Sequence, residues 1–121
     1  MKLHNIGNDD LRHALVYHKA PFDTNEAEGI AAEIPGANDE LDWHWIIKLR
    51  DGWWVYLSAW CDYTGWDCRS GFHEYATAET ALGVAQLAPE IEIGSLRVIR
   101  KQLIAQLEGK QPYATYYKDM D

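Results

Sequence analysis

The chain has 121 residues, of which 47% are hydrophobic and 25% charged, a globular composition that excludes a disordered chain, a collagen-like repeat and a disulfide-rich miniprotein. This length predicts a single domain over residues 1–121. No run approaches the roughly 20 apolar residues that cross a membrane. The N-terminal MKLHNIGNDD lacks the apolar core of a secretion signal, so we expect a cytoplasmic protein with no membrane role.

The net charge is −8, and the acidic residues are unevenly placed. Residues 20–47 contain no Lys or Arg but seven carboxylates. This pattern predicts a negative face that attracts basic partners and repels nucleic acid, because phosphate-backbone binding depends on clustered Lys and Arg. The alternative is a solvated face that only aids solubility.

The N-terminal part, residues 8–34, predicts two helices. Asn8 is a good N-cap, Asp9 and Asp10 suit the positive end of the helix dipole, and Pro21 ends the first helix.

The second predicted helix follows Asp23, which has the capping-box spacing to Glu26. Four apolar residues then recur at helical spacing: Ala27, Ile30, Ala31 and Ile34. The helix is expected to end at Pro35-Gly36 and to present an acidic surface that includes Glu26, Glu28 and Glu33.

Two segments rich in aromatic and β-branched residues, Leu41–Leu49 and Trp53–Cys61, flank Asp51-Gly52, a strong hairpin signal. With Asp51 and Gly52 as central turn residues, the predicted pairs are Leu49–Trp54, Ile47–Tyr56, Trp45–Ser58 and Trp43–Trp60. A turn at Thr64-Gly65 returns Cys68–Tyr75 as a third strand. Its predicted pairs are Cys61–Cys68, Leu57–Phe72 and Trp60–Arg69.

The C-terminal third returns to helix. Thr77 is expected to cap Ala78–Ala88, and Ser95 to cap a longer helix that reaches Leu107 and stops at Gly109. The Tyr-rich tail, residues 110–121, is expected to dock on the domain or a partner. The predicted fold class is α+β: a three-stranded antiparallel meander over about 41–75, packed with two N-terminal helices and two C-terminal helices (77–108).

Aromatic density marks the predicted meander, since all six tryptophans fall within residues 43–66. The predicted register gathers five rings on one sheet face: Trp43, Trp45, Trp54, Tyr56 and Trp60. That face is either a core or a recognition surface, and the sequence leaves both open. The candidate partner-binding residues are Glu26, Glu28, Glu33, Trp43, Trp45, Trp54, Trp60 and Trp66.

No complete catalytic or cofactor signature is present, so we expect no cofactor and favour a non-enzymatic role. The alternative is a small-molecule or metal-ion site built from Cys61, Cys68, Asp62, Asp67 and His44. The two cysteines lack the short spacing of zinc knuckles, and Asp62 and Asp67 more commonly accept hydrogen bonds from turn amides. Cys61, His44 and Asp42 share a predicted face, as in a thiol enzyme, but no oxyanion-hole turn follows the cysteine.

The string WCDYTGWDCRSG, Trp60–Gly71, resembles a group of small uncharacterised proteins of bacteriophages and prophage-bearing bacteria. The match is carried by C-D-Y-T-G-W-D-C and Ser70, preceded by D-W-H-W at Asp42–Trp45, and Arg69 stands where that group usually has Gln. The resemblance implies a phage-type origin and nothing about catalysis.

Two functions therefore remain. The first is a small acidic, phage-encoded accessory protein, of the host-takeover or anti-defence type, that binds a basic host or phage protein and not nucleic acid. The sequence leaves open whether the chain forms a homodimer. The second is the small-molecule or ion-binding domain described above.

Overall fold

A computed structural model describes residues 2–7 and 10–111. The N-cap expected at Asn8, with Asp9, and most of the predicted tail (112–121) lie outside the described residues. In chain order the elements are α1 (Asp10–Tyr17), β1 (Ala27–Ile34), β2 (Trp43–Leu49), β3 (Trp54–Cys61), β4 (Ser70–Ala78), α2 (Ala81–Ala85), β5 (Ile91–Glu92), β6 (Arg97–Val98) and α3 (Arg100–Leu107).

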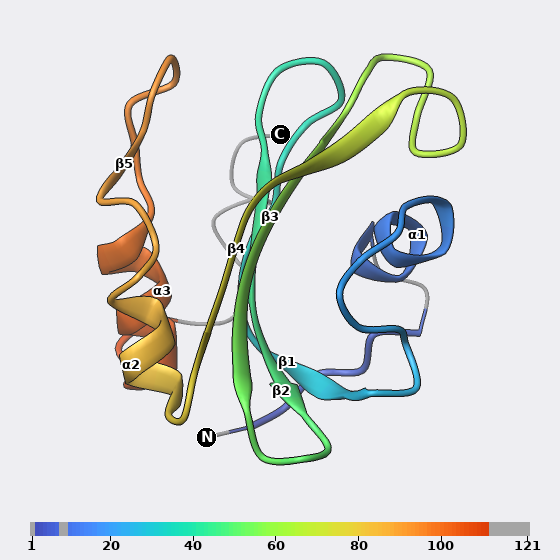
Figure 1. Ribbon diagram of the computed structural model, residues 1–121. Helices are drawn as coiled ribbons and strands as arrows, with labels where there is room; N and C mark the ends of the chain where they lie inside the picture. Colours follow the sequence, from blue (N-terminus) through green and yellow to red (C-terminus); the bar gives the residue numbers. More distant parts are fainter. Residues whose placement is uncertain (1, 8–9, 112–121) are drawn as a thin grey trace.

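The main sheet is an antiparallel meander in the order β1-β2-β3-β4. Figure 1 shows it edge-on, with α1 against one face and α2, α3 and the β5–β6 hairpin against the other. The α+β class is confirmed, but the described chain has four strands in this sheet and three helices, not three strands and four helices. No helix among the described residues is long and apolar enough to cross a membrane.

The second predicted helix is wrong, because residues 27–34 form β1. The capping signal is real but serves a turn: Asp23 Oδ1 accepts hydrogen bonds from the Asn25 and Glu26 amides at 2.8 and 3.1 Å. Both faces of β1 are buried, and two bulges change which face successive residues meet. The strand therefore lacks clean alternation, and its small apolar residues imitate a helical stripe.

The hairpin at Asp51-Gly52 is confirmed, but its predicted register is wrong by one residue. The Leu49 amide donates to the Trp53 carbonyl at 2.9 Å, and Gly52 has a φ of 98°, so the loop has three residues, 50–52. Such loops commonly end in a positive-φ Gly. The pairs Leu49–Trp54, Ile47–Tyr56, Trp45–Ser58 and Trp43–Trp60 are replaced by Lys48–Trp54, Ile46–Tyr56, Trp45–Leu57 and Trp43–Ala59.

This difference in register divides the aromatic residues between the two faces of the sheet. When the pairing of β2 with β3 shifts by one residue, every β3 side chain lies on the opposite face, relative to β2, from the one predicted. Trp43 and Trp45 pack beneath α1, whereas Tyr56 packs with Ile46 against α2 and α3. The predicted single aromatic face is therefore wrong. Both faces of the sheet are core.

The third predicted strand is displaced toward the C-terminus, to Ser70–Ala78 instead of Cys68–Tyr75. Its predicted pairs Cys61–Cys68, Leu57–Phe72 and Trp60–Arg69 are replaced by Cys61–Ser70, Leu57–Tyr75 and Trp60–Gly71. The turn at Thr64-Gly65 belongs to a longer loop, closed where the Asp62 amide donates to the Arg69 carbonyl at 2.9 Å.

The last two helices are shorter than predicted. Thr80, not Thr77, caps α2, since its hydroxyl accepts from the Gly83 amide at 2.9 Å. Thr77 is paired in β4. Gly109, with a φ of 74°, follows the end of α3 as predicted.

The predicted start of the last helix, at Ser95, is wrong because residues 91–98 form the β5–β6 hairpin. Gly94 and Leu96, with φ values of 97° and 61°, turn the chain between the two strands. This hairpin forms one wall of the site described next.

Candidate functional site

The three glutamates expected on one helical face do not form a common surface. Glu26 and Glu28 are exposed, and Glu28 pairs with Lys48 at 3.2 Å. Glu33 is buried, and its carboxylate accepts the Trp45 indole N–H at 2.7 Å. Glu33 therefore belongs to the core beneath α1 and presents no charge to a partner.

Most of the candidate tryptophans are also structural. Trp43 and Trp66 are buried, and both indole N–H groups donate to the Asp10 carboxylate at 2.9 Å. Trp45 is fully buried, and Trp54 is half-buried with Lys48 over its ring. Trp60, also half-buried, is the candidate ring that lines a surface hollow.

The residues of the alternative ion or small-molecule site are not brought together. Cys61 lies in the core beneath α1, whereas His44 lies on the opposite face of the sheet, where it lines a cleft together with Asp42, so the predicted face shared by Cys61, His44 and Asp42 is wrong for Cys61. Cys68 is exposed, as is Asp67. Among residues 2–7 and 10–111, no group of three or more His, Cys, Asp or Glu side chains is placed to hold a metal ion.

The 62–69 loop contains two acidic residues, and one of them, Asp62, makes hydrogen bonds within the turn. The Thr64 hydroxyl and the Thr64 amide both donate to Asp62 Oδ1, the amide at 2.9 Å. These bonds, the hydroxyl first, lower the pKa of Asp62. Asp62 thus fixes the turn, as the sequence favoured.

The structure instead forms a cleft of about 530 Å³ between the sheet and the β5–β6 hairpin. We call it the acidic cleft. Its charged and titratable lining residues are Glu40, Asp42, His44, His73, Glu74 and Glu92. Neither Lys nor Arg occurs among the described residues that line it.

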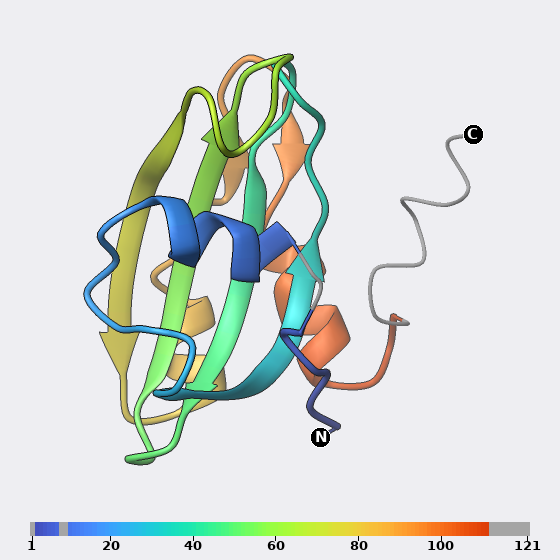
Figure 2. The same ribbon diagram turned by 90° about the vertical axis from the view of Figure 1, so that its right-hand side faces the viewer.

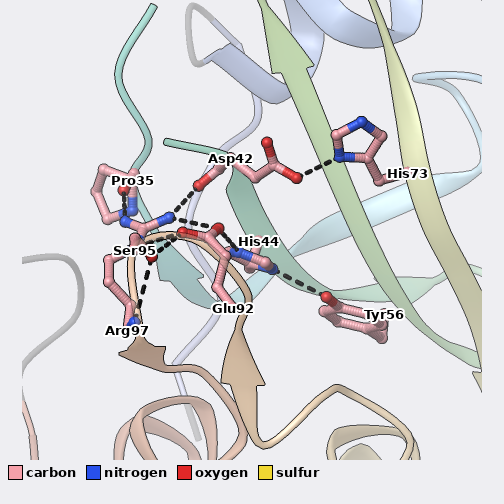
Figure 3. Close-up of polar contacts among 8 residues, drawn as sticks. All are labelled: Pro35, Asp42, His44, Tyr56, His73, Glu92, Ser95 and Arg97. Carbon is pink, nitrogen blue, oxygen red and sulfur yellow. Dashed lines mark hydrogen bonds and ion pairs between the residues drawn. The ribbon is translucent and has the colours of Figure 1, made fainter. Parts of the chain in front are cut away.

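A polar network joins the acidic cleft to the residues behind it: His44 and Glu92 line the cleft, and Arg97 and Tyr56, which do not line it, contact them (Figure 3). Glu92 Oε1 lies 2.7 Å from His44 Nε2 and accepts Arg97 Nη2–H at 2.9 Å, while Oε2 accepts Arg97 Nε–H at 3.0 Å. His44 Nδ1 lies 2.9 Å from the Tyr56 hydroxyl. Because an ionised carboxylate only accepts, His44 Nε2–H is the donor in the bond to Glu92 Oε1.

Burial and these bonds shift two pKa values in opposite directions. Burial alone would raise the pKa of Glu92, but hydrogen bonds from His44, Arg97 and Ser95 hold it well below its usual range. Burial, followed by the charge of Glu74, raises the pKa of Tyr56 well above its ordinary value. Glu92 is thus an anion that already accepts hydrogen bonds from His44, Arg97 and Ser95.

Arg97 also ties the hairpin to the sheet. Its Nη1 donates to the Pro35 carbonyl at 2.7 Å and its Nη2 to the Asp42 carbonyl at 2.5 Å (Figure 3). All these contacts join elements far apart in sequence. They tie the hairpin to the connection between β1 and β2.

A bulge in β4 forms the opposite wall. Ser58 pairs with Glu74 and Ala59 with Phe72, which leaves His73 as the extra residue. A bulge redirects a side chain, and here both His73 and Glu74 line the acidic cleft. His73 Nδ1 contacts Asp42 Oδ2 (Figure 3).

The His73 ring also stacks on Trp60, with centroids 5.9 Å apart. Trp60 in turn lies over Gly71, where an added Cβ would fall 3.1 Å from the indole nitrogen. Asp42, His73 and Trp60 share a second hollow of about 310 Å³, which Asp39 and Glu40 also line.

The rim of the acidic cleft includes the exposed apolar residues Ile91 and Ile93, and Leu96, which does not line the cleft, lies beside them in the same hairpin. Ile93 is 96% exposed and Leu96 74% exposed at the turn of the β5–β6 hairpin. Leu96 holds a positive φ, which a side chain with a bulky Cγ adopts at an energetic cost.

Sequence reasoning missed the acidic cleft because His44 and Glu92 are 48 residues apart. One local signal was present: Ile91 and Ile93 alternate with Glu92 before Gly94-Ser95, which is the pattern of a short hairpin and not of a helix.

Comparisons of the chain with protein-family models, with curated proteins and with solved structures gave no match. The case for a function therefore comes from the geometry and charge of the acidic cleft.

Proposed function

We propose that this protein binds a cationic segment of a protein partner in the acidic cleft. The observation that carries the proposal is the composition of the cleft: four carboxylates, no Lys or Arg among the described lining residues, and an exposed apolar rim. Glu92 is paired with Arg97 and Asp42 Oδ2 contacts His73, so Glu40 and Glu74 are the exposed carboxylates that face a ligand.

The second hollow fits the same kind of ligand. Trp60 offers an aromatic surface beside Asp39 and Glu40. A guanidinium or ammonium group beside an exposed ring gains about 0.5–1 kcal/mol from the ring quadrupole. An Arg or Lys side chain that passes Asp42 would reach this hollow.

Charge alone gives weak binding. A cation about 4 Å from one carboxylate gains roughly 1 kcal/mol in water and about 4 kcal/mol near a protein surface, before desolvation is counted. Burial of an apolar side chain adds about 1.5–3 kcal/mol. The rim residues Ile91 and Ile93 are therefore expected to supply affinity, and the carboxylates to supply specificity and association rate.

The proposal keeps the predicted partner class and moves the binding surface. Glu33, Trp43, Trp45 and Trp66 are buried and unavailable to a partner. A phage-type origin, a role as an inhibitor of a host protein and a cytoplasmic location are further proposals, supported by the resemblance at Trp60–Gly71 and by the sequence composition.

The test is a binding assay with fluorescent peptides in which one Lys or Arg is flanked by apolar residues. Fluorescence anisotropy is measured for the unmodified protein, for Glu40→Lys/Glu74→Lys and for the matched control Glu26→Lys/Glu28→Lys. All four glutamates are exposed, and both variants change the net charge equally.

We expect the cleft variant to lose at least tenfold in affinity for the peptides that bind, and the control to stay within about threefold. Equal losses would mean that only net charge matters. Absence of binding by every cationic peptide would also overturn the proposal.

A further inference from the structure

The two edge strands of the main sheet, β1 and β4, differ in whether other segments bond to their outer edges. At β1, His4 and Ile30 exchange two backbone hydrogen bonds of 2.8 Å. Further along β1, the Gln106 side chain of α3 bonds both the N–H and the C=O of Glu33 at 2.9 Å. Figure 2 shows the N-terminal segment beside β1, at the edge opposite β4. The outer edge of β1 is thus covered in two places.

β4 forms the other edge. Among the described residues, β3 is the strand that pairs with β4, and no further segment does. The side chains of Glu74, Tyr75 and Thr77 are exposed. Natural edge strands are commonly protected by charged side chains, Pro or a bulge; Ser70–Ala78 has the bulge at His73 and one charged residue, Glu74, but no Lys or Pro. Beyond the bulge at His73, Glu74–Ala78 pairs in regular register with β3.

We propose that the partner's cationic segment binds in extended form, as a fifth strand added along Glu74–Ala78 of β4. This inference rests on the proposed function and specifies how the partner is held. Charge complementarity favours this edge for a cationic segment. Glu74 belongs both to the edge strand β4 and to the lining of the acidic cleft.

The pleat of the sheet sets the pattern of side chains in the added strand. Glu74 pairs with Ser58 and Ala76 with Tyr56, so these two residues lie on the face that carries α2, α3 and the cleft. Alternate residues of an added strand share that face, where a Lys or Arg meets Glu74 and the small Ala76 leaves room for its stem. The intervening residues lie beside Tyr75 and Thr77, where β-branched side chains pack well.

A second copy of this chain fits the same edge poorly. Residues 70–79 contain two glutamates and no Lys or Arg, and like charges on neighbouring strands oppose pairing. A cationic partner has no such penalty.

The experiment uses the peptide Thr-Lys-Val-Lys-Val-Lys-Thr and two N-methylated versions, one methylated at the Lys amides and one at the Val amides. In an edge strand, every second amide points at the neighbouring strand and the others point to solvent. We expect one methylated peptide to lose at least tenfold in affinity and the other to stay within about threefold. In parallel, the unmethylated peptide should slow hydrogen exchange at Glu74–Ala78 at least tenfold and leave Ile30 unchanged.

Equal affinities of the two methylated peptides, with no protection of β4, would overturn strand addition. If the unmethylated peptide still binds and depends on Glu40 and Glu74, the proposed function survives that failure. If no version binds, both proposals fail. Protection of β4 that rises with protein concentration in the absence of peptide would assign the edge to a second copy and overturn the inference.

Discussion

At the scale of single residues, the two cysteines have opposite environments. Cys61 is buried and donates to Asn38 Oδ1 at 3.3 Å, while Cys68 is exposed. Burial, with smaller effects of Asp10 and Asp62, raises the pKa of Cys61 to about 11. The thiolate is the reactive form. At pH 8 we expect a disulfide reagent to modify one thiol per chain rapidly and the second only after denaturation; two fast thiols would contradict the buried placement of Cys61.

Glu92 should make stability depend on pH. Its folded-state pKa is depressed, so its stabilisation is present above the unfolded pKa of about 4.3 and is lost as the pH falls toward the folded value. We expect Glu92→Gln to lower the free energy of unfolding by about 2–3 kcal/mol at pH 7, and by less at pH 3, where part of the stabilisation is already lost, in urea titrations. The exposed Glu90, 3.7 Å from Arg100, provides the control: Glu90→Gln should change stability by under about 0.5 kcal/mol at both pH values.

Asp10 uses both carboxylate oxygens, one for Trp43 and one for Trp66. An Asn side chain at this position has one acceptor oxygen for one indole N–H. Its NH₂ group would then face the other indole N–H, donor against donor. Asp10→Asn should therefore cost about 1–2 kcal/mol, or several degrees in Tm for a chain of this size. At Asp23 one oxygen makes the described turn bonds, so Asp23→Asn should leave Tm nearly unchanged, and an equal fall in both variants would refute this reading.

At the scale of elements, the β5–β6 hairpin carries a residue poorly suited to its backbone. Leu96 has a φ of 61° and is largely exposed, whereas Asn tolerates this conformation better. Leu96→Asn should raise stability by about 0.5–1 kcal/mol in thermal denaturation. Ile93→Asn, at the neighbouring exposed position, should weaken the binding of cationic peptides without the gain in stability.

The helices and strands also show how much of the structure short sequence patterns can predict. The Asp51-Gly52 signal located the hairpin, but two- and three-residue loops share it, and the difference of one residue decided which face each tryptophan occupies. Asp23 marked a true chain turn, yet what followed was β1 and not a helix. Apolar spacing could not separate these two outcomes, because a strand buried on both faces has no polar side to reveal its period.

At the scale of the whole molecule, the net charge of −8 should act on association kinetics. A cationic peptide is drawn toward the acidic cleft by the field of the entire chain, and salt screens that field. We expect the association rate constant in stopped-flow measurements to fall about tenfold between low and physiological ionic strength, while the dissociation rate changes little. A rate independent of salt would contradict electrostatic steering.

The sequence by itself determined the α+β class, the central hairpin, the stop near Gly109, the turn chemistry of Asp62 and the acidic character of the chain, because each depends on local backbone preferences or on composition. Tertiary structure decided the rest. It made residues 27–34 a strand by burying both of their faces, and it brought His44 and Glu92 together at the acidic cleft, with Arg97 paired to Glu92. No local pattern encodes these outcomes, since burial on two sides and contacts between distant segments arise only when separate elements pack.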